Sequence, residues 1–385
     1  MKDLLFLAHR APFPPDRGDK IRSYHILRHL SERWRIHLCA FGETEADFDP
    51  PTAFSARLAS CRIIPRTKPM PLAAVQALAS GKPVSLTAFA HAGMARAVAD
   101  ARRAGVAATY IFSGQMAQYR GTEPTVMDMV DVDSAKFAAW AGQARGPKAL
   151  MLRREARLLA RFEQAVAVAA NATLFVSEAE AALFRARGGT GRIVAVENGI
   201  DTAVYDPAQV VPVREPGPLI VFTGQMDYQP NIDAVTHFAR HILPAVRAVH
   251  PRARFAIVGR APTPAVRRLA GEGVIVTGAV PDTRVWLAAA RVCVAPLMLA
   301  RGIQNKLLEA MAMARPIVAS RAAAEGIDHR GTIAVADGDR DFAERVVAAL
   351  EGPAANPAAR AQVLDRYDWR ARLAPLDRLL EDIAA

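Results

Sequence analysis

The chain has 385 residues, more than one hydrophobic core usually holds, so two domains are expected. Apolar residues make up 51% and charged residues 23%, which is a globular composition and excludes a disordered chain. The formal net charge is +11, and the excess of basic residues lies in the first 200 positions. A basic surface can serve nucleic acid, an anionic membrane or a phosphorylated acceptor, or it can be a solvated face without a partner. Nucleic acid is not favoured, because no zinc finger or aromatic-interleaved basic patch is present.

The cysteine pattern and the N-terminus indicate the compartment. Cys39, Cys61 and Cys293 are scattered and outside any C-x-x-C spacing, so neither a disulfide framework nor a zinc site is predicted. The opening MKDLLFLAHR holds an apolar run too short for a signal peptide and is expected to be a strand. No stretch reaches the roughly 18 uninterrupted apolar residues that a membrane-spanning helix needs, since Gly81 and Pro83 break the run around residue 77. These features predict a cytoplasmic protein, with peripheral contact at the inner membrane face left open.

Short apolar runs alternate with helical patterns along the first half of the chain. This alternation predicts the α/β class, with parallel sheets and crossover helices. Strands are expected at residues 4–8, 36–40, 61–64, 109–112, 125–130, 172–176 and 193–196. Apolar residues at helical spacing predict helices within 17–34 and 148–170.

The pattern breaks around residues 197–217, a segment rich in proline and turn residues, where we place the domain boundary. A second alternating series follows, with strands expected at 219–222, 254–258, 273–277, 292–295, 317–319 and 332–335. The prediction is two doubly wound Rossmann-like domains with an interdomain cleft. Their bounds are 1–200 and 201–364, followed by amphipathic C-terminal helices over 365–385.

The first segment with chemical meaning is AHRAPFPPDRGDKIRSYH, where Gly18 precedes a helix. A helix N-terminus behind a strand end offers backbone N–H groups and the positive end of the helix dipole, so a phosphate or carboxylate can bind there. Arg17, Lys20 and Arg22 add positive charge nearby. The alternative is a tight strand-to-helix turn without a ligand, for which glycine and aspartate are ordinary residues.

Three strands of the second half also end in glycine, at Gly224, Gly259 and Gly278. In open α/β sheets the ligand crevice lies outside the carboxyl ends of the strands, so Gly18 and Gly224 are expected to face each other across the interdomain cleft. Arg260 could reach phosphates or a base, although a surface arginine is the commoner explanation.

The most specific segment is VAPLMLARGIQNKLLEAMAMARPIVAS, in which a strand, a loop and a helix succeed one another. Lys306 and Glu309 are three residues apart on the expected helix and therefore share a face. A carboxylate there can accept hydrogen bonds from both ribose hydroxyls, while Lys306 and Arg301 can neutralise a diphosphate. The alternative is an intrahelical surface pair, worth only a few tenths of a kcal/mol. The remaining predicted donor-binding residues are Gly302, Ile303, Gln304 and Asn305.

The run LLEAMAMARPIVAS resembles the L-E-A-M-A-x-G-x-P-V-V-A-S signature of retaining GT-B glycosyltransferases, and VENGIDTAVYDP resembles their interdomain segment. Together with PFPPDRGDKIRSYHILRHL, MDMVDVDSAKFAAWA and FTGQMDYQPNIDAV, the chain is similar to the sugar transferases associated with exosortase and PEP-CTERM exopolysaccharide loci. The resemblance covers nearly the whole length. It implies a nucleotide-sugar donor, a saccharide or lipid-linked saccharide acceptor, transfer with retention, and C-terminal helices that return toward the first domain.

The E-x7-E pattern of the family carries over only in part. Glu309 matches the second glutamate, which holds the donor ribose in relatives, whereas Arg301 stands where relatives have the first. Relatives often place a histidine near the end of the strand expected at 125–130, and Asp131 is the candidate catalytic carboxylate there. Strand alternation would put Asp131 and Asp133 on one face. The alternative is that these acids cap the next helix or pair with nearby cations.

No metal or cofactor is expected, because helix N-termini and basic side chains can neutralise the diphosphate and no D-x-D motif or histidine cluster is evident. Stabilisation of the departing diphosphate by prearranged charges would then be the main catalytic contribution. Two alternatives share the fold: a nucleotide-sugar epimerase and a noncatalytic subunit of a partner transferase. A dinucleotide-dependent oxidoreductase ranks last, since no G-x-G-x-x-G follows the early strands.

Overall fold

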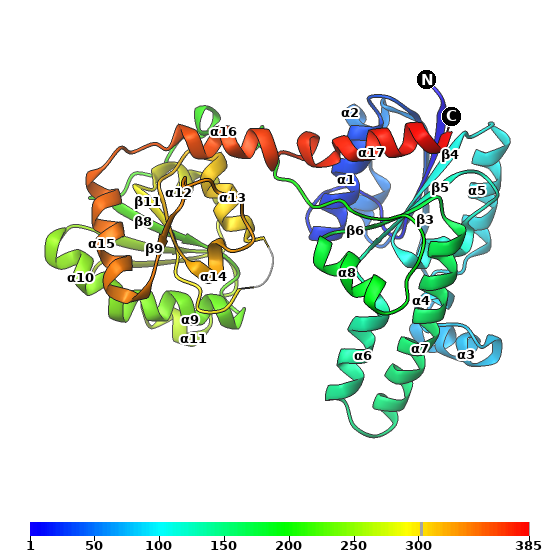
Figure 1. Ribbon diagram of the computed structural model, residues 1–385, viewed down its shortest axis with the longest axis horizontal. Helices are drawn as coiled ribbons and strands as arrows, with labels where there is room; N and C mark the ends of the chain where they lie inside the picture. Colours follow the sequence, from blue (N-terminus) through cyan, green and yellow to red (C-terminus); the bar gives the residue numbers. More distant parts are fainter. Residues whose placement is uncertain (301–302, 385) are drawn as a thin grey trace. The chain divides into compact units, whose positions relative to one another are not determined.

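The computed structural model describes residues 1–300 and 303–384. The chain divides into two compact units. Unit 1 comprises Met1–Asn198 together with Arg372–Ala385, and unit 2 comprises Gly199–Ala371. Each unit is a parallel sheet with helices on its faces (Figure 1), so the predicted α/β class is confirmed.

Unit 1 is built on a seven-stranded parallel sheet in the order β3-β2-β1-β4-β5-β6-β7. Its strands are β1 (Asp3–Ala8), β2 (Arg35–Gly42), β3 (Leu58–Pro65), β4 (Ala108–Phe112), β5 (Thr125–Val130), β6 (Ala172–Phe175) and β7 (Ile193–Ala195). Strands β1 and β4 are buried at every position. Continuous apolar runs of this kind are typical of a parallel sheet that is covered on both faces.

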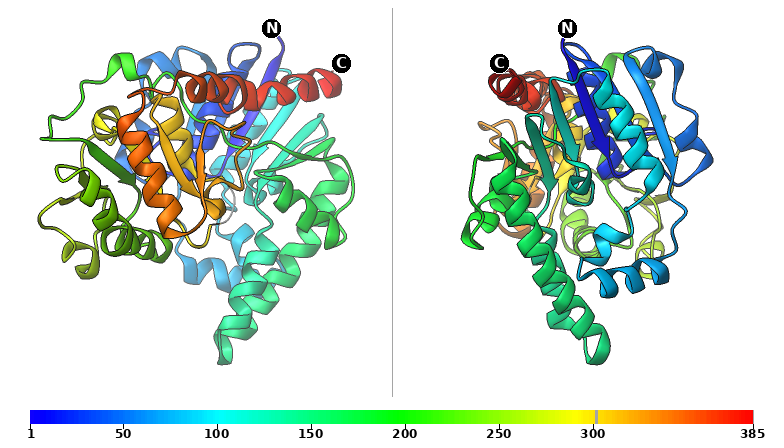
Figure 2. Two further views of the ribbon diagram at one scale, coloured as in Figure 1. Left: turned by 60° about the vertical axis from the view of Figure 1, so that its left-hand side comes forward. Right: turned by 90° about the vertical axis from the view of Figure 1, so that its right-hand side faces the viewer.

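The helices of unit 1 include a long hairpin that projects from the sheet (Figures 1 and 2). The α-helices are α1 (Gly18–Leu30), α2 (Thr52–Ser55), α3 (Met70–Ser80), α4 (Val84–Thr87), α5 (Ala92–Arg103), α6 (Asp133–Gln143), α7 (Gly146–Ala169) and α8 (Glu178–Ala186). Short 3₁₀ turns are η1 (Glu45–Phe48) and η2 (Gly114–Tyr119). The hairpin is formed by α6 and α7, which pack closely against each other.

Unit 2 has a six-stranded parallel sheet in the order β10-β9-β8-β11-β12-β13. Its strands are β8 (Leu219–Thr223), β9 (Arg254–Val258), β10 (Val274–Gly278), β11 (Val292–Ala295), β12 (Ile317–Ser320) and β13 (Ala334–Ala336). Its helices are α9 (Gln229–His237), α10 (Leu243–Val249), α11 (Pro264–Arg267), α12 (Arg284–Ala289), α13 (Asn305–Ala312), α14 (Arg321–Ala324), α15 (Gly338–Glu351) and α16 (Pro357–Arg366). A 3₁₀ turn, η3 (Pro207–Gln209), precedes β8, and a π-helical turn, η4 (Phe238–Ile242), joins α9 to α10.

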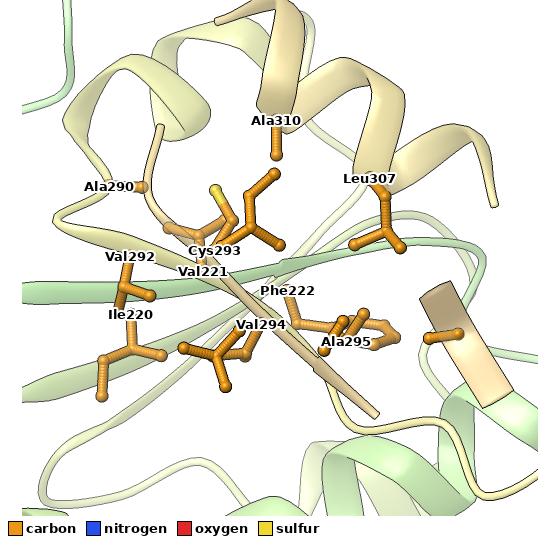
Figure 3. Packing of buried hydrophobic residues seen from close by; sticks show 14 of the residues in the cluster. Ile220, Val221, Phe222, Ala290, Val292, Cys293, Val294, Ala295, Leu307 and Ala310 are labelled. Atoms are coloured by element: carbon orange, nitrogen blue, oxygen red, sulfur yellow. The ribbon is translucent and has the colours of Figure 1, made fainter. Parts of the chain in front are cut away.

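Strand order reverses once in each sheet, between β1 and β4 in unit 1 and between β8 and β11 in unit 2. Such a switch point leaves a crevice at the carboxyl ends of the two strands, because their connections leave in opposite directions. In unit 2, helix α13 packs over this place. Its Leu307 and Ala310 lie against β8 and β11 (Figure 3), which fixes the side chains on the same helix relative to the strand ends.

The last helix, α17 (Trp369–Ala384), belongs to unit 1 from Arg372 onward. His29 of α1 lies 2.9 Å from Asp377, Arg33 pairs with Glu381 at 2.8 Å, and Lys2 Nζ donates to the carbonyl of Ala384 at 2.5 Å. Buried leucines of the helix add apolar packing. The C-terminal segment is therefore an integral part of unit 1.

All thirteen predicted strands are present, with ends within a few residues of those predicted. In the part of the chain that the structure describes, no helix is both long enough and apolar enough to span a bilayer.

Candidate functional site

The candidate site lies in unit 2, where β8 ends at the switch point of the sheet. Gly224 follows β8, and a Cβ at this position would lie 2.8 Å from Asn231 Nδ2 and 3.4 Å from Lys306 Nζ. Gly259, which follows β9, has a φ of 153°, and a Cβ there would collide with the carbonyl of Gly224. Glycine is required at Gly259 because backbone lies in the space of a Cβ, whereas a Cβ on Gly224 would force the side chain of Asn231 to shift.

Lys306 is the cation of this site. It lies in the first turn of α13, its Nζ donates to Asn231 Oδ1 at 2.6 Å, and the same nitrogen lies 4.1 Å from the centre of the Phe222 ring. Burial lowers the pKa of Lys306 to about 8, although the charge of Glu309 opposes this change. A neutral amide and an aromatic face orient the ammonium without neutralising it, so it remains available to an anion.

Glu309 is the matching carboxyl, one turn further along α13. Burial raises its pKa to about 7, against the opposing effects of a hydrogen bond from Tyr205 and the charge of Lys306. The hydroxyl of Tyr205 interacts with Glu309 and Thr283, and burial raises the pKa of this tyrosine. Perturbed acid and base groups held side by side at a strand-end crevice are typical of functional sites.

A cavity of about 290 Å³ opens beside these residues. It is lined by Tyr228, Pro230, Asn231, Leu297, Leu299, Ala300 and Gln304, which come from the start of α9, the loop after β11 and the N-cap of α13. A larger depression of about 660 Å³ lies between α10 and α15, and none of its lining residues comes from the connections that follow β8 and β11. We therefore assign the site to the smaller cavity, because it is lined by Asn231, the hydrogen-bond partner of Lys306.

Other predicted donor-binding residues fall around the same crevice. Arg260 is exposed and its guanidinium donates to Gln225 Oε1 at 3.1 Å, beside Gly224. Ile303 packs against the core of unit 2, while Gln304 is the N-cap residue of α13 and Asn305 is its first residue. Gly278 ends the edge strand β10 with a φ of 68°. The predicted residues Arg301 and Gly302 lie outside the described residues.

The alternative of a solvated Lys–Glu surface pair is wrong for α13. The two side chains are three residues apart and influence each other electrostatically, as the spacing predicts. However, Lys306 bonds Asn231 and Glu309 bonds Tyr205, and burial dominates both pKa values. The partners come from 75 and 104 positions away in the sequence, so local spacing could not indicate them.

In unit 1, Gly18 begins α1 as predicted within one residue, and a Cβ on it would meet open space. The prediction that nearby cations add available charge is wrong. Lys20 is buried against Asp47 at 2.5 Å, and Arg22 is buried against Asp128 at 3.0 Å. These pairs hold α1 against the sheet, since a buried ion needs its partner inside the protein.

Arg17, the third of these cations, is also paired. Its guanidinium lies 3.3 Å from Asp19 and 3.2 Å from Glu43. The start of α1 therefore carries acids that compensate the predicted positive charge.

His9 was not singled out from the sequence, although it directly follows the first buried strand. Its Nε2 lies 3.2 Å from Asp19 Oδ2, and its ring stacks on Phe112 at 5.7 Å. Burial lowers the pKa of His9, so the imidazole is neutral at pH 7. His9 and Arg10 hold the pKa of Asp19 below its usual range, although burial alone would raise it. A neutral histidine thus lies at the switch point of unit 1.

The three acids after β5 have different environments. Asp128 is fully buried, accepting from Arg22 and from the hydroxyl of Tyr110 at 2.7 Å. The side chain of Asp131 is 49% exposed, and partial desolvation of its carboxyl group by the surrounding protein is the main cause that raises its pKa. Lys136 Nζ lies 4.0 Å from Asp131 and 2.7 Å from Asp133.

The predicted strand alternation does not extend to Asp131 and Asp133. The register of β5 shifts before Val130, which has a φ of 69°, and α6 begins at Asp133. A turn, and not a pleated strand, therefore places both carboxylates beside Lys136. Their contacts agree with the alternative that these acids pair with a nearby cation. The catalytic role of Asp131 stays a prediction.

Among residues 1–300 and 303–384, no group of three or more His, Cys, Asp or Glu side chains is placed to hold a metal ion. The three cysteines are free, and burial raises the pKa of Cys39 and Cys293 to about 12.

The part of the chain that contains this crevice matches a known protein family. Residues 217–352 match the family profile "Glycosyl transferases group 1". This range contains Gly224, Asn231, Lys306 and Glu309. No curated protein matches the sequence of the chain.

Solved structures match along almost the full length. HepE of Anabaena, in complex with UDP and glucose, is 14% identical with a TM-score of 0.60, covering 99% of this chain and 100% of that one. A glycosyltransferase of Rickettsia africae is 11% identical with a TM-score of 0.64, covering 99% and 98%. An α,α-trehalose-phosphate synthase (UDP-forming) of Burkholderia vietnamiensis is 13% identical with a TM-score of 0.62, covering 100% and 98%. The chain therefore has the GT-B fold of glycosyltransferases, and its residues 217–352 match the group 1 glycosyl transferase family.

Proposed function

We propose that the protein transfers a sugar from a nucleotide-sugar donor to a saccharide or lipid-linked saccharide acceptor. One observation carries this proposal: a partly buried ammonium and a partly buried carboxyl, Lys306 and Glu309, stand one turn apart at the strand-end crevice of the region that matches the group 1 family. Both are oriented by neutral partners, Asn231 and Tyr205. A cation and a carboxylate at this spacing can contact the diphosphate and the ribose of a nucleoside diphosphate, respectively.

The donor fits this arrangement with its diphosphate at the start of α13 and its ribose further along the helix. The first turn of a helix presents N–H groups and the positive end of the dipole, and Lys306 adds a full charge. Glu309, when ionised, accepts hydrogen bonds from two ribose hydroxyls. The cavity beside Asn231 and Gln304 then receives the sugar.

In this proposal, catalysis depends on positively charged side chains that are already in position before the donor reacts. As the bond between the anomeric carbon and the diphosphate oxygen breaks, negative charge grows on the leaving oxygen. Lys306 and Arg301 stabilise that charge more in the transition state than in the bound donor. Asp131 remains our proposed catalytic carboxylate of unit 1. We expect no metal ion or cofactor to be needed.

The family resemblance supports the finer features. Retention of configuration and a role in exopolysaccharide synthesis follow from the likeness to the transferases of exosortase and PEP-CTERM loci. The cytoplasmic location follows from the sequence features, and action at the inner membrane face from a lipid-linked acceptor. Arg301 stands where those relatives have a glutamate, and we propose that it contacts phosphate or an acidic sugar.

A noncatalytic GT-B subunit is the alternative that this substitution favours. Such a subunit would bind a partner transferase and catalyse no transfer alone. A nucleotide-sugar epimerase would release nucleotide without any saccharide acceptor. Both are distinguished from the proposal by nucleotide release measured with and without acceptor.

The test is a thermal-shift screen with UDP-, GDP- and ADP-sugars, followed by a transfer assay with the donor that binds. A donor at a hundred times its Kd stabilises the folded protein by about 2.7 kcal/mol, which is easily measured. We expect one nucleotide class to raise the melting temperature of wild type but not of Glu309→Ala. The exposed Glu272, also in unit 2, supplies the control variant Glu272→Ala. If no nucleotide sugar stabilises wild type, the proposal is wrong.

A further inference from the structure

Helix α3 presents its large apolar side chains to solvent. Val75 is 63% exposed and Leu78 is 69% exposed, and Leu72 lies on the same face, whereas Ala73 and Ala77 are fully buried against unit 1. A surface helix normally turns its large apolar residues toward the core, because burying them stabilises the fold more than burying alanine does. Folding of unit 1 therefore does not account for this arrangement.

The hairpin of α6 and α7 extends the same surface. Arg154 of α7 donates to the carbonyls of Ala77 at 2.8 Å and Lys82 at 3.2 Å, which holds α7 against the end of α3. Leu150 and Met151 are exposed and precede Arg154 by four and three positions, so they lie on the side of α7 that faces α3. Both views in Figure 2 show the hairpin projecting from unit 1.

The segments that carry these apolar side chains are rich in basic residues, of which Arg66 and Lys136 are paired with acids. Between Asp49 and Asp100 the chain has no acidic residue and carries six basic ones: Arg57, Arg62, Arg66, Lys68, Lys82 and Arg96. Residues 134–162 carry seven: Lys136, Arg145, Lys148, Arg153, Arg154, Arg157 and Arg161.

The one acid within 134–162, Glu155, does not offset this charge at the surface. It is buried and accepts hydrogen bonds from the backbone N–H groups of Val84 and Ser85, both at 2.8 Å. The surface of α3 and the hairpin thus carries exposed apolar side chains together with exposed basic ones. We call it the apolar-basic face and define it by Leu72, Val75, Leu78, Leu150, Met151, Lys82 and Lys148.

We propose that the apolar-basic face docks on an anionic lipid bilayer. Its leucine, valine and methionine side chains enter the boundary between headgroups and acyl chains, while its lysines and arginines contact anionic headgroups. The positive charge of the face favours an anionic bilayer over a second copy of the chain. In a symmetric contact between two copies, the basic residues of one copy would lie against those of the other and repel them. This proposal does not depend on the proposed transfer reaction.

Vesicle flotation tests this proposal with the full chain. Wild type is expected to float with vesicles of phosphatidylcholine and phosphatidylglycerol, and not with phosphatidylcholine alone. The double variant Val75→Glu, Leu78→Glu should bind roughly tenfold or more weakly. Its control is Val211→Glu, at a valine of unit 2 that is 84% exposed, which should bind as wild type does.

A second pair of variants tests the charges. Lys82→Ala and Lys148→Ala should each weaken vesicle binding roughly fivefold, since each removes a cation near the surface. Arg340→Ala removes the same charge from α15 of unit 2, where the side chain is 94% exposed, and should leave binding unchanged.

Three results would overturn the proposal. The first is equal vesicle binding by wild type and by both sets of variants. The second is equal binding to neutral and anionic vesicles. The third is oligomeric wild type that becomes monomeric on Val75→Glu, Leu78→Glu without lipid, which would make the face a contact between copies. Donor-induced thermal shifts are expected to be equal in all these variants, so failure of this proposal is distinguishable from failure of the proposed transfer.

Discussion

Glu309 makes the stability of unit 2 depend on pH in a direction that can be worked out. Burial raises the pKa of this carboxyl from its ordinary value of 4.5 to about 7. Between pH 4.5 and about pH 7 the folded state binds more protons than the unfolded state, so the free energy of unfolding falls as the pH rises through this range. The rise from 4.5 to about 7 corresponds to on the order of 3 kcal/mol.

The perturbation is Glu309→Gln, which keeps the size of the side chain and removes its ionisation. Urea unfolding of unit 2 in both proteins at pH 5 and pH 8 gives the comparison. Wild type should lose on the order of 3 kcal/mol relative to the variant over this range. Glu163 of unit 1, whose pKa burial also raises to about 7, is present in both proteins and cancels in the difference.

The control is Glu272→Gln, at an exposed glutamate of the same unit, which should follow wild type at both pH values. Parallel pH dependences for wild type and Glu309→Gln would refute the reasoning. They would mean that the carboxyl is solvated and that Tyr205 does not enclose it.

Further predictions concern activity. The kcat/KM should rise with pH through about 7, as Glu309 ionises, and fall above about 8, as Lys306 loses its proton; a flat profile would contradict both assignments. Lys306→Ala and Arg301→Ala should each lower kcat roughly tenfold to a thousandfold at saturating donor, and an unchanged kcat would remove them from the reaction. Gly224→Ala should weaken donor binding, because its Cβ would meet an amide nitrogen at 2.8 Å, whereas Gly271→Ala meets open space and should bind as wild type does. Transfer should survive EDTA, and a loss that Mg²⁺ restores would show that a cation is needed.

The sequence predicted the sheets well because parallel strands buried on both faces are continuous apolar runs. It predicted the local part of the site for a similar reason: Lys306 and Glu309 share a helix face through their spacing alone. The partners of these residues, Asn231 and Tyr205, are brought in by folding and leave no local signal. The resemblance to GT-B glycosyltransferases is confirmed for the fold and for residues 217–352, while its association with exopolysaccharide loci stays a prediction.

Unit 1 shows where sequence reasoning reached its limit. Arg22 looked like an available cation beside a helix N-terminus, but Asp128, 106 positions away, neutralises it inside the protein. The predicted alternation of side chains failed after β5 because the backbone of Val130 adopts the left-handed conformation, which is rare for a β-branched residue. The outward apolar face of α3 was also missed, since periodicity shows that a helix is amphipathic and not which face is buried.

The most direct test of the central claim is a coupling experiment on the ribose contact. Titration calorimetry would measure the affinity of wild type and Glu309→Ala for the nucleoside diphosphate identified by the screen and for its 2′,3′-dideoxy analogue. We predict that Glu309→Ala weakens binding of the parent nucleotide by roughly tenfold to a hundredfold, the scale of hydrogen bonds to a charged group, and barely changes binding of the analogue. Equal losses for both nucleotides would contradict the account, because Glu309 would then act without touching the ribose.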